Sequence, residues 1–215
     1  SMMGYTAFLS GATMMPRGFG SMLSMLITGT LSNKIDNRLF VILGLALIGG
    51  SSLVFGSLNL QISNMNIAIP NFFMGMGMGL SMIPIMNLSV DTLKNEQMTN
   101  ATGIQNLLKN IGSAIGTSLV ATMLTRFAQA HQYMLVGKMS ELNPVFIERV
   151  QTTAGALSAY TEHSVAQYMA QYSYYGQLVK QSTLWAFIDS FRIFGVLCLA
   201  VIPLLLLMKK IKKDA

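Results

Sequence analysis

Residues 39–90 read LFVILGLALIGGSSLVFGSLNLQISNMNIAIPNFFMGMGMGLSMIPIMNLSV, and this stretch decides the fold. It contains no charged residue from its first position to its last. A transmembrane helix needs about 20 apolar residues, so the stretch is long enough for two such helices and a turn. The polar segment NLQISNMN (59–66) divides it into predicted spans at 39–58 and 67–90.

The composition of the whole chain extends this prediction. Charged residues make up only 10% of the chain and the mean hydropathy is +0.52, whereas a soluble domain carries about 25% charged residues. Three further apolar segments, at 5–31, 104–127 and 183–208, bring the predicted spans to five. The predicted fold class is therefore all-α: a polytopic membrane protein with four spans in 1–127, a partly helical segment at 128–182, and the last span at 183–208.

The distribution of Lys and Arg predicts the orientation of these spans. The segments after the first, third and fifth spans contain basic residues, and the segment between the second and third spans contains none. The positive-inside rule places the basic segments in the cytoplasm, so segment 128–182 is expected outside. The basic tail KKIKKDA (209–215) is then cytoplasmic, and its expected partner is the lipid bilayer rather than nucleic acid. The first span begins almost at the first residue without a targeting segment, which favours the C-terminal part of a longer chain.

Glycine and proline recur inside two of the predicted spans. Small residues four apart allow two membrane helices to approach closely, whereas proline loosens the helix backbone. In the third span Gly75 and Gly79 have this spacing, whereas Gly77 between them is expected to point to another side of the helix. Tight helix packing and gating of a transport pathway both remain open as interpretations. The residues concerned are Pro70, Gly75, Gly79 and Pro84 in the third span and Gly112 and Gly116 in the fourth.

A resemblance to a known family rests on five features that occur in order. They are GYTAFLSGATMMPRGFGSM, GTLSNKIDNRLFVILG, GMGMGLSMIP, NATGIQNLLKNIGSAIGTSLVATMLTRFAQAH and AFIDSFRIFGVL. This succession resembles the C-terminal domain of a major facilitator superfamily drug:proton antiporter of the fourteen-span EmrB/QacA type. The resemblance implies that the five helices form most of that domain and that an N-terminal transmembrane domain is missing.

The resemblance also implies a function and a location. It implies proton-coupled export of amphipathic drugs or toxic compounds by alternating access, in the inner membrane of a bacterium and without a cofactor. In a Gram-negative cell it implies a periplasmic adaptor protein of the EmrA type. Two other functions stay open: a non-transporting membrane scaffold or assembly subunit, and an exporter of a specific metabolite such as a siderophore or a lipid.

Two segments depart from the family pattern. The family's cytoplasmic loop motif resembles G-x-L-x-D-R-x-x-x-R; here Gly29 and Arg38 fit, Asn33 occupies the usual Asp position, and Asp36 is a candidate substitute. In the fourth span a Lys stands in place of the usual Arg. A polar face there, expected to form hydrogen bonds between helices, consists of Gln105, Asn106, Lys109 and Asn110.

Three charged residues inside the predicted spans are candidates for transport or coupling. Arg17 lies midway along the first span, where a charge normally faces protein or water; the alternative is that it reaches an interface. Asp189 and Arg192 lie three apart, so a local ion pair is favoured over a proton relay. His131 and His163 have no ligand-like spacing, and the sequence predicts no metal site. No phosphate loop, GxSxG or CxxC motif is present, so we expect no catalytic residues.

Overall fold

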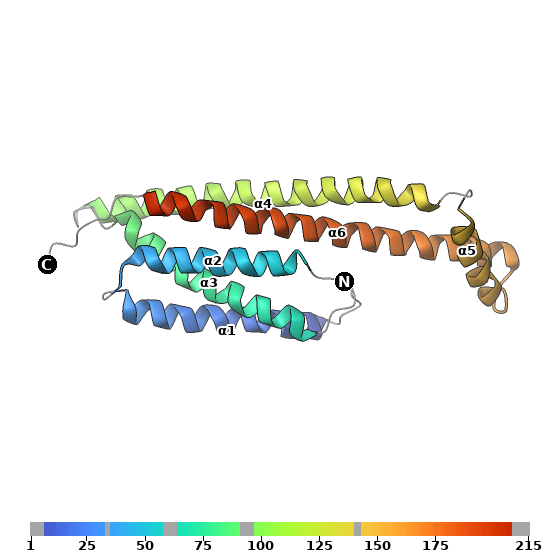
Figure 1. Cartoon of the computed structure of the whole chain (residues 1–215), viewed down its shortest axis with the longest axis horizontal. Helices are drawn as coiled ribbons and strands as arrows, with labels where there is room; N and C mark the ends of the chain where they lie inside the picture. The colour runs from blue at the N-terminus through green and yellow to red at the C-terminus, as the bar shows by residue number, and fades with distance from the viewer. Residues whose placement is uncertain (1–6, 33–34, 58–63, 91–96, 140–142, 208–215) are drawn as a thin grey trace. The chain divides into compact units, whose positions relative to one another are not determined.

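The computed structural model of the protein describes residues 7–32, 35–57, 64–90, 97–139 and 143–207, and these ranges consist of helices joined by short turns (Figure 1). This confirms the predicted all-α class. In chain order the elements are α1 (Ala7–Leu31), α2 (Asn37–Phe55), α3 (Asn64–Val90), α4 (Met98–Val136), a 3-10 turn η2 (Gly137–Met139), α5 (Pro144–Leu157) and α6 (His163–Leu207).

The chain forms two compact units. The first combines residues 3–118 with 190–215, and therefore contains α1, α2, α3, the start of α4 and the end of α6. The second consists mainly of residues 119–189 and contains the end of α4, α5 and most of α6.

In the first unit, α3 packs against both α1 and α2, and its glycines make these contacts possible. A Cβ atom at Gly75 would collide with the backbone oxygen of Arg17 in α1, and one at Gly79 would collide with Ser24 of the same helix. A Cβ atom at Gly77 would lie 2.6 Å from the backbone oxygen of Gly44 in α2. The glycines of α3 therefore allow close contact with two helices. Gly75 and Gly79 face α1, and Gly77 faces α2.

A second glycine pair brings α2 close to the end of α6. A Cβ atom at Gly49 would lie 3.1 Å from the backbone oxygen of Gly195, and one at Gly195 would lie 3.0 Å from that of Gly49. The rings of Phe55 and Phe191 lie beside this contact with centroids 5.2 Å apart.

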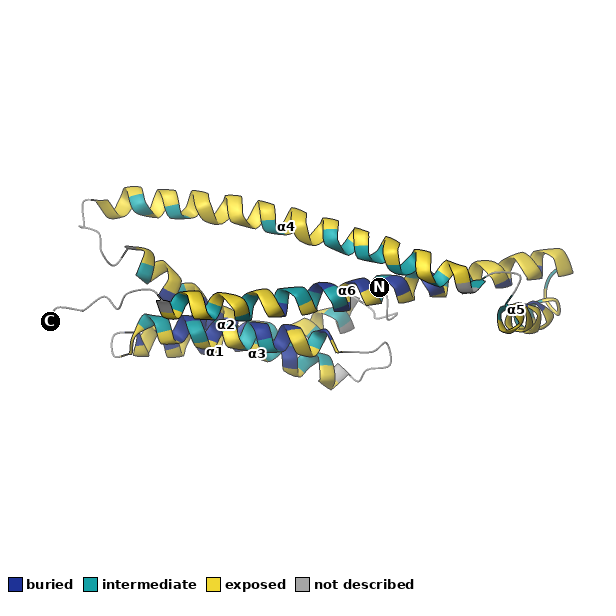
Figure 2. Ribbon diagram, turned by 45° about the horizontal axis from the view of Figure 1, so that its top comes forward, coloured by how far each residue is buried: buried dark blue, intermediate teal, exposed yellow. Residues whose placement is uncertain are grey.

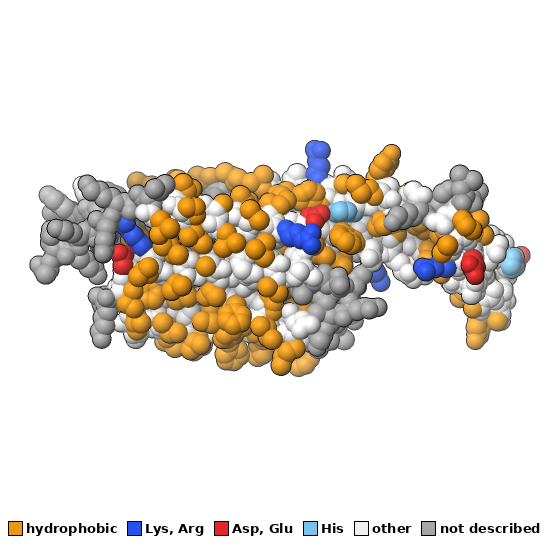
Figure 3. Space-filling model, in the orientation of Figure 1, with side chains coloured by type: hydrophobic (Ala, Val, Ile, Leu, Met, Phe, Trp, Pro, Cys, Tyr) orange, Lys and Arg blue, Asp and Glu red, His pale blue; other side chains and the backbone are white. Residues whose placement is uncertain are grey.

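Small polar residues fill the buried faces of this unit. Ser24 and Thr28 of α1 are fully buried, and the Thr28 hydroxyl donates to the Ser24 carbonyl at 2.8 Å. Ser52 of α2 is buried in the same way, and its hydroxyl donates a hydrogen bond to the Ile48 carbonyl at 2.8 Å. Because each hydroxyl is satisfied within its own helix, burial leaves no donor unpaired. Large apolar side chains lie on the outside instead, over α1, α2 and α3 (Figures 2 and 3).

The second unit has a small core of its own. Val150 and Ala154 of α5 and Ala170 of α6 are buried together, and Tyr174 packs against them. The Tyr174 hydroxyl lies 3.0 Å from that of Thr153, which adds a polar contact between the two helices. The side chain of Asn143 caps the start of α5 by accepting a hydrogen bond from the backbone of Val145 at 3.2 Å.

The helices differ from the predicted spans in number and length. Among the residues that the structure describes, four helices are long and apolar enough to cross a membrane, within 37–55, 65–89, 98–136 and 163–206, whereas the sequence predicted five spans. The first predicted span forms α1, whose apolar character is diluted by Arg17 and by many Gly, Ser and Thr residues. The fourth helix extends past the predicted end at 127, and α6 joins part of the predicted external segment to the last span. Proline does not occur in α6 before Pro203, so nothing there interrupts the helix.

We predict that Gly20→Ala destabilises the chain by about 1 to 3 kcal/mol, because the new methyl group meets the backbone oxygen of Phe72, which cannot move aside. Gly18→Ala is the matched control: it lies on the same helix, and no atom lies within 4 Å of its added Cβ. Thermal unfolding in detergent measures both. Equal stability of the two variants would contradict the packing of α1 on α3.

Candidate functional site

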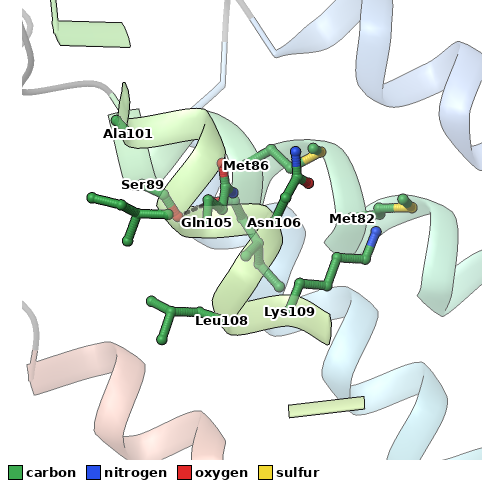
Figure 4. A pocket seen from close by; sticks show the side chains of 10 residues that line it. Met82, Met86, Ser89, Ala101, Gln105, Asn106, Leu108 and Lys109 are labelled. Carbon is green, nitrogen blue, oxygen red and sulfur yellow. Dashed lines mark hydrogen bonds between the residues drawn. The ribbon is translucent and has the colours of Figure 1, made fainter. Parts of the chain in front are cut away.

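A cavity of about 680 Å³ lies between α3 and the start of α4, within the first unit (Figure 4). This volume is in the range of pockets that hold drug-sized molecules. The α3 side is formed by Met82, Ile85, Met86 and Ser89, and the α4 side by Ala101, Ile104, Gln105, Asn106, Leu108 and Lys109.

The wall of this cavity is mainly apolar and adaptable. Met82 and Met86 contribute flexible thioether side chains, which fit ligands of varied shape. Gln105 and Asn106 add amide groups, and Lys109 is the charged residue among the described residues that line the cavity. The described wall thus combines an apolar surface with a positive charge, an arrangement suited to amphipathic molecules. Asn110, the remaining member of the predicted polar face, is exposed and is not among the lining residues.

Arg17 is half-buried in α1 and lies against α3. Its Nη2 donates a hydrogen bond to the thioether sulfur of Met78 at 3.2 Å. Thioether sulfur is a weak acceptor, and a guanidinium group carries five N–H donors. Within the described part of the chain no carboxylate lies within 4.0 Å of Arg17. The guanidinium therefore retains capacity for an anionic or carbonyl partner.

Asp189 lies next to a residue that the sequence analysis did not connect with it. Its Oδ2 lies 2.8 Å from Nε2 of His131, across the helices α4 and α6. Arg192 donates from Nε to the backbone oxygen of Gly56 at 2.8 Å, which ties α6 to the end of α2. No local pattern predicts the contact between His131 and Asp189, because the two residues are 58 positions apart.

The loop motif that the sequence predicts to be cytoplasmic contributes structural contacts at the start of α2. Asp36 is the N-cap residue, and its Oδ1 accepts a hydrogen bond from the backbone N–H of Arg38 at 3.1 Å. Nearby, Ser32 donates to Asn37 at 2.7 Å and accepts from Asn87 of α3 at 3.4 Å. These bonds join the ends of α1 and α3 to the start of α2. Gly29 is exposed with open space around it, and Asn33 lies outside the described residues.

The predicted packing residues fall into two groups. Pro70, Gly75, Gly79 and Pro84 are all buried in α3, which continues as a helix through both prolines. Gly112 and Gly116 lie on α4, where no described residue is buried, and an added Cβ at either would have no atom within 4 Å. Close approach of another helix to Gly112 and Gly116 stays a prediction.

Comparison with known proteins places the chain in a family. Residues 1–117 match the model of the Major Facilitator Superfamily, which is more than half of the chain. The whole chain is 24% identical to the uncharacterized MFS-type transporter YhcA of Bacillus subtilis and covers 41% of its length. It is 29% identical over 67% of its residues to the probable multidrug resistance protein EmrY of Escherichia coli, covering 28% of that protein. It is 31% identical over 63% of its residues to a multidrug resistance protein B homolog of Mycobacterium tuberculosis, covering 25% of it.

These matches define the class of protein: a multi-pass membrane protein of a transporter family. The chain belongs to the major facilitator superfamily. It spans between a quarter and about two fifths of the length of these relatives. No solved structure matches the chain.

We predict that Asp36→Ala lowers the stability of the chain by about 1 kcal/mol, since it removes the side chain that caps α2. Asp36→Asn is the matched control, because an amide oxygen also accepts a hydrogen bond at an N-cap position. The thermal midpoint of each variant measures the effect. A fall as large for Asn as for Ala would show that the charge, rather than the cap, is what matters.

Proposed function

We propose that the chain is the C-terminal part of a proton-coupled exporter of amphipathic drugs or toxic compounds, and that the cavity between α3 and α4 contacts the substrate during transport. The observation that carries this proposal is the composition of the cavity wall, whose described residues supply methionine and aliphatic side chains, two amides and one cation. A site of this kind accepts apolar molecules of varied shape and orients their polar end.

The names of two relatives support export as the activity. They are a probable multidrug resistance protein and a multidrug resistance protein B homolog. Alternating access in this superfamily requires two helical domains that move about a central site. The present chain would supply most of the second domain, and an N-terminal transmembrane domain would supply the first. The C-terminal tail would lie in the cytoplasm of the bacterium.

Arg17 would act at the contact with the N-terminal domain or in the transport pathway. Its guanidinium cannot lose its charge at any working pH, so it needs a partner within the membrane. The Met78 sulfur supplies one weak acceptor. A carboxylate of the N-terminal domain, or a polar substrate group, would supply the stronger one.

The cavity also separates the proposed function from its alternatives. A membrane scaffold or assembly subunit binds partner proteins through its helix faces. Filling the cavity of such a protein would leave the growth of the host in the presence of drugs unchanged. An exporter of one metabolite, such as a siderophore or a lipid, would lose that single activity while conferring no resistance to unrelated drugs. A periplasmic adaptor protein would belong to the drug exporter in a Gram-negative cell.

Filling the cavity tests its role. Ala101→Trp places an indole ring in the lining of the cavity. Overpacking such a site costs about 1 to 3 kcal/mol, so we expect substrate affinity, and with it the drug resistance of the host, to fall about fivefold or more. Leu107→Trp is the matched control on the same helix, at an exposed position outside the lining. The measurement is drug resistance of an efflux-deficient host that expresses the whole protein, normalised to the amount in the membrane. Unchanged resistance with Ala101→Trp would rule the cavity out as a substrate contact.

Replacing Arg17 tests its interaction with a partner. We expect Arg17→Lys to reduce resistance, because an ammonium cannot form two parallel hydrogen bonds, and Arg17→Leu to reduce it further, by about tenfold, because the charge is lost. The same resistance assay at matched expression measures both variants. Full resistance with Arg17→Leu would mean that Arg17 is an interfacial anchor without a role in transport.

A further inference from the structure

His131 and Asp189 bring two titratable side chains together in the second unit. Nε2 of His131 and Oδ2 of Asp189 are 2.8 Å apart. The carboxylate oxygen accepts this hydrogen bond, so Nε2 carries a proton. The two side chains are 25% and 31% exposed, which leaves both open to water. The contact joins α4 to α6 and is the one carboxylate–imidazole contact within ion-pair distance in the described part of the chain.

Aromatic and uncharged polar groups surround this pair. Trp185 lies one turn before Asp189 on α6, and its ring centroid is 6.0 Å from that of His131. The neighbouring residue on α4, Gln132, donates to the hydroxyl of Tyr175 at 2.9 Å. The hydrogen bond between Gln132 and Tyr175 joins α4 and α6 through two uncharged side chains. The contact between α4 and α6 thus includes a bridge of uncharged side chains and a bridge that contains an imidazole.

The charged groups nearest to the pair along the chain are all basic. Arg126 precedes His131 by five positions on α4, while Lys180 precedes and Arg192 follows Asp189 on α6. Arg126, Lys180 and Arg192 keep their charge through the range in which imidazole titrates. Imidazole is the side chain whose charge ordinarily changes between about pH 5 and pH 8.

We propose that His131 and Asp189 form a proton-binding site that holds α4 to α6. The carboxylate already carries one charge, and a proton bound by the imidazole adds the opposite charge, so that the hydrogen bond becomes an ion pair. The attraction is stronger with an imidazolium than with a neutral imidazole, and acid favours the imidazolium. The proton is taken from and returned to water, and no bond between heavy atoms forms or breaks.

The position of the pair along the chain suits a site that samples the external medium. His131 follows the predicted end of the fourth span at 127, and Asp189 lies just inside the predicted start of the last span at 183. Trp185, four residues before Asp189, is of a residue type that is enriched at membrane interfaces. A metal ion is not the expected ligand, because no group of three or more His, Cys, Asp or Glu residues gathers in the part of the chain that was described.

The test measures the α4–α6 contact in the whole protein at pH 5 and pH 8. Spin labels replace Tyr133 of α4 and Tyr172 of α6, both exposed, and the distribution of distances between them is recorded. In the parent protein we expect a narrow distribution at pH 5 that broadens at pH 8. Asp189→Asn and His131→Gln should each abolish this difference, and His131→Arg, which is permanently charged, should keep the narrow distribution at both pH values.

Gln132→Ala is the matched control, since it removes the uncharged bridge and should preserve the response to pH. A parent distribution that is equal at pH 5 and pH 8, or a response that persists in Asp189→Asn, would overturn the proposal. The result does not depend on transport. If the protein exports no drug but the labels respond as expected, the proposed function fails and the proton-binding site stands.

Discussion

Backbone contact between helices is the constraint on which the rest of the first unit depends. In a bilayer, apolar side chains gain nothing by leaving the lipid, so helices associate through close packing and hydrogen bonds. The chain meets this constraint with glycine. Gly75 and Gly79 place α3 on α1, Gly77 places it on α2, and Gly49 with Gly195 places α2 on α6. Any Cβ atom at these positions would separate the helices.

This packing also positions polar groups. Because Gly75 lies directly against the backbone oxygen of Arg17, the Arg17 side chain leaves α1 beside α3 and reaches Met78 one turn further along. The same close approach buries Ser24 and Thr28, whose hydroxyls turn back to their own helix. Large side chains are left to face outward, which is the reverse of a soluble core. The packing of α1 on α3 and the location of the one charge in α1 are therefore consequences of the same few glycines.

Features set by local sequence could be predicted, and features set by distant contacts could not. The uncharged stretch 39–90 predicted two helices, and the spacing of glycines in α3 indicated which of them share a face, because helical periodicity is local. The sequence did not predict that α6 runs unbroken from His163, since polar composition hides helical continuity. It did not connect His131 with Asp189, because only the packing of α4 on α6 brings them together. The cavity escaped prediction for the same reason: it needs α3 and α4 side by side, although its residues Gln105, Asn106 and Lys109 had been singled out as a polar face.

Helix α4 contributes residues to both sites. It contributes Lys109 to the cavity and His131 to the contact with Asp189, and the stretch from 109 to 131 is longer than the about 20 residues that cross a bilayer. No described residue of α4 is buried, and its glycines at 112 and 116 face open space. Close approach of another helix to Gly112 and Gly116 would cover this part of α4, as the spacing of the two glycines predicts.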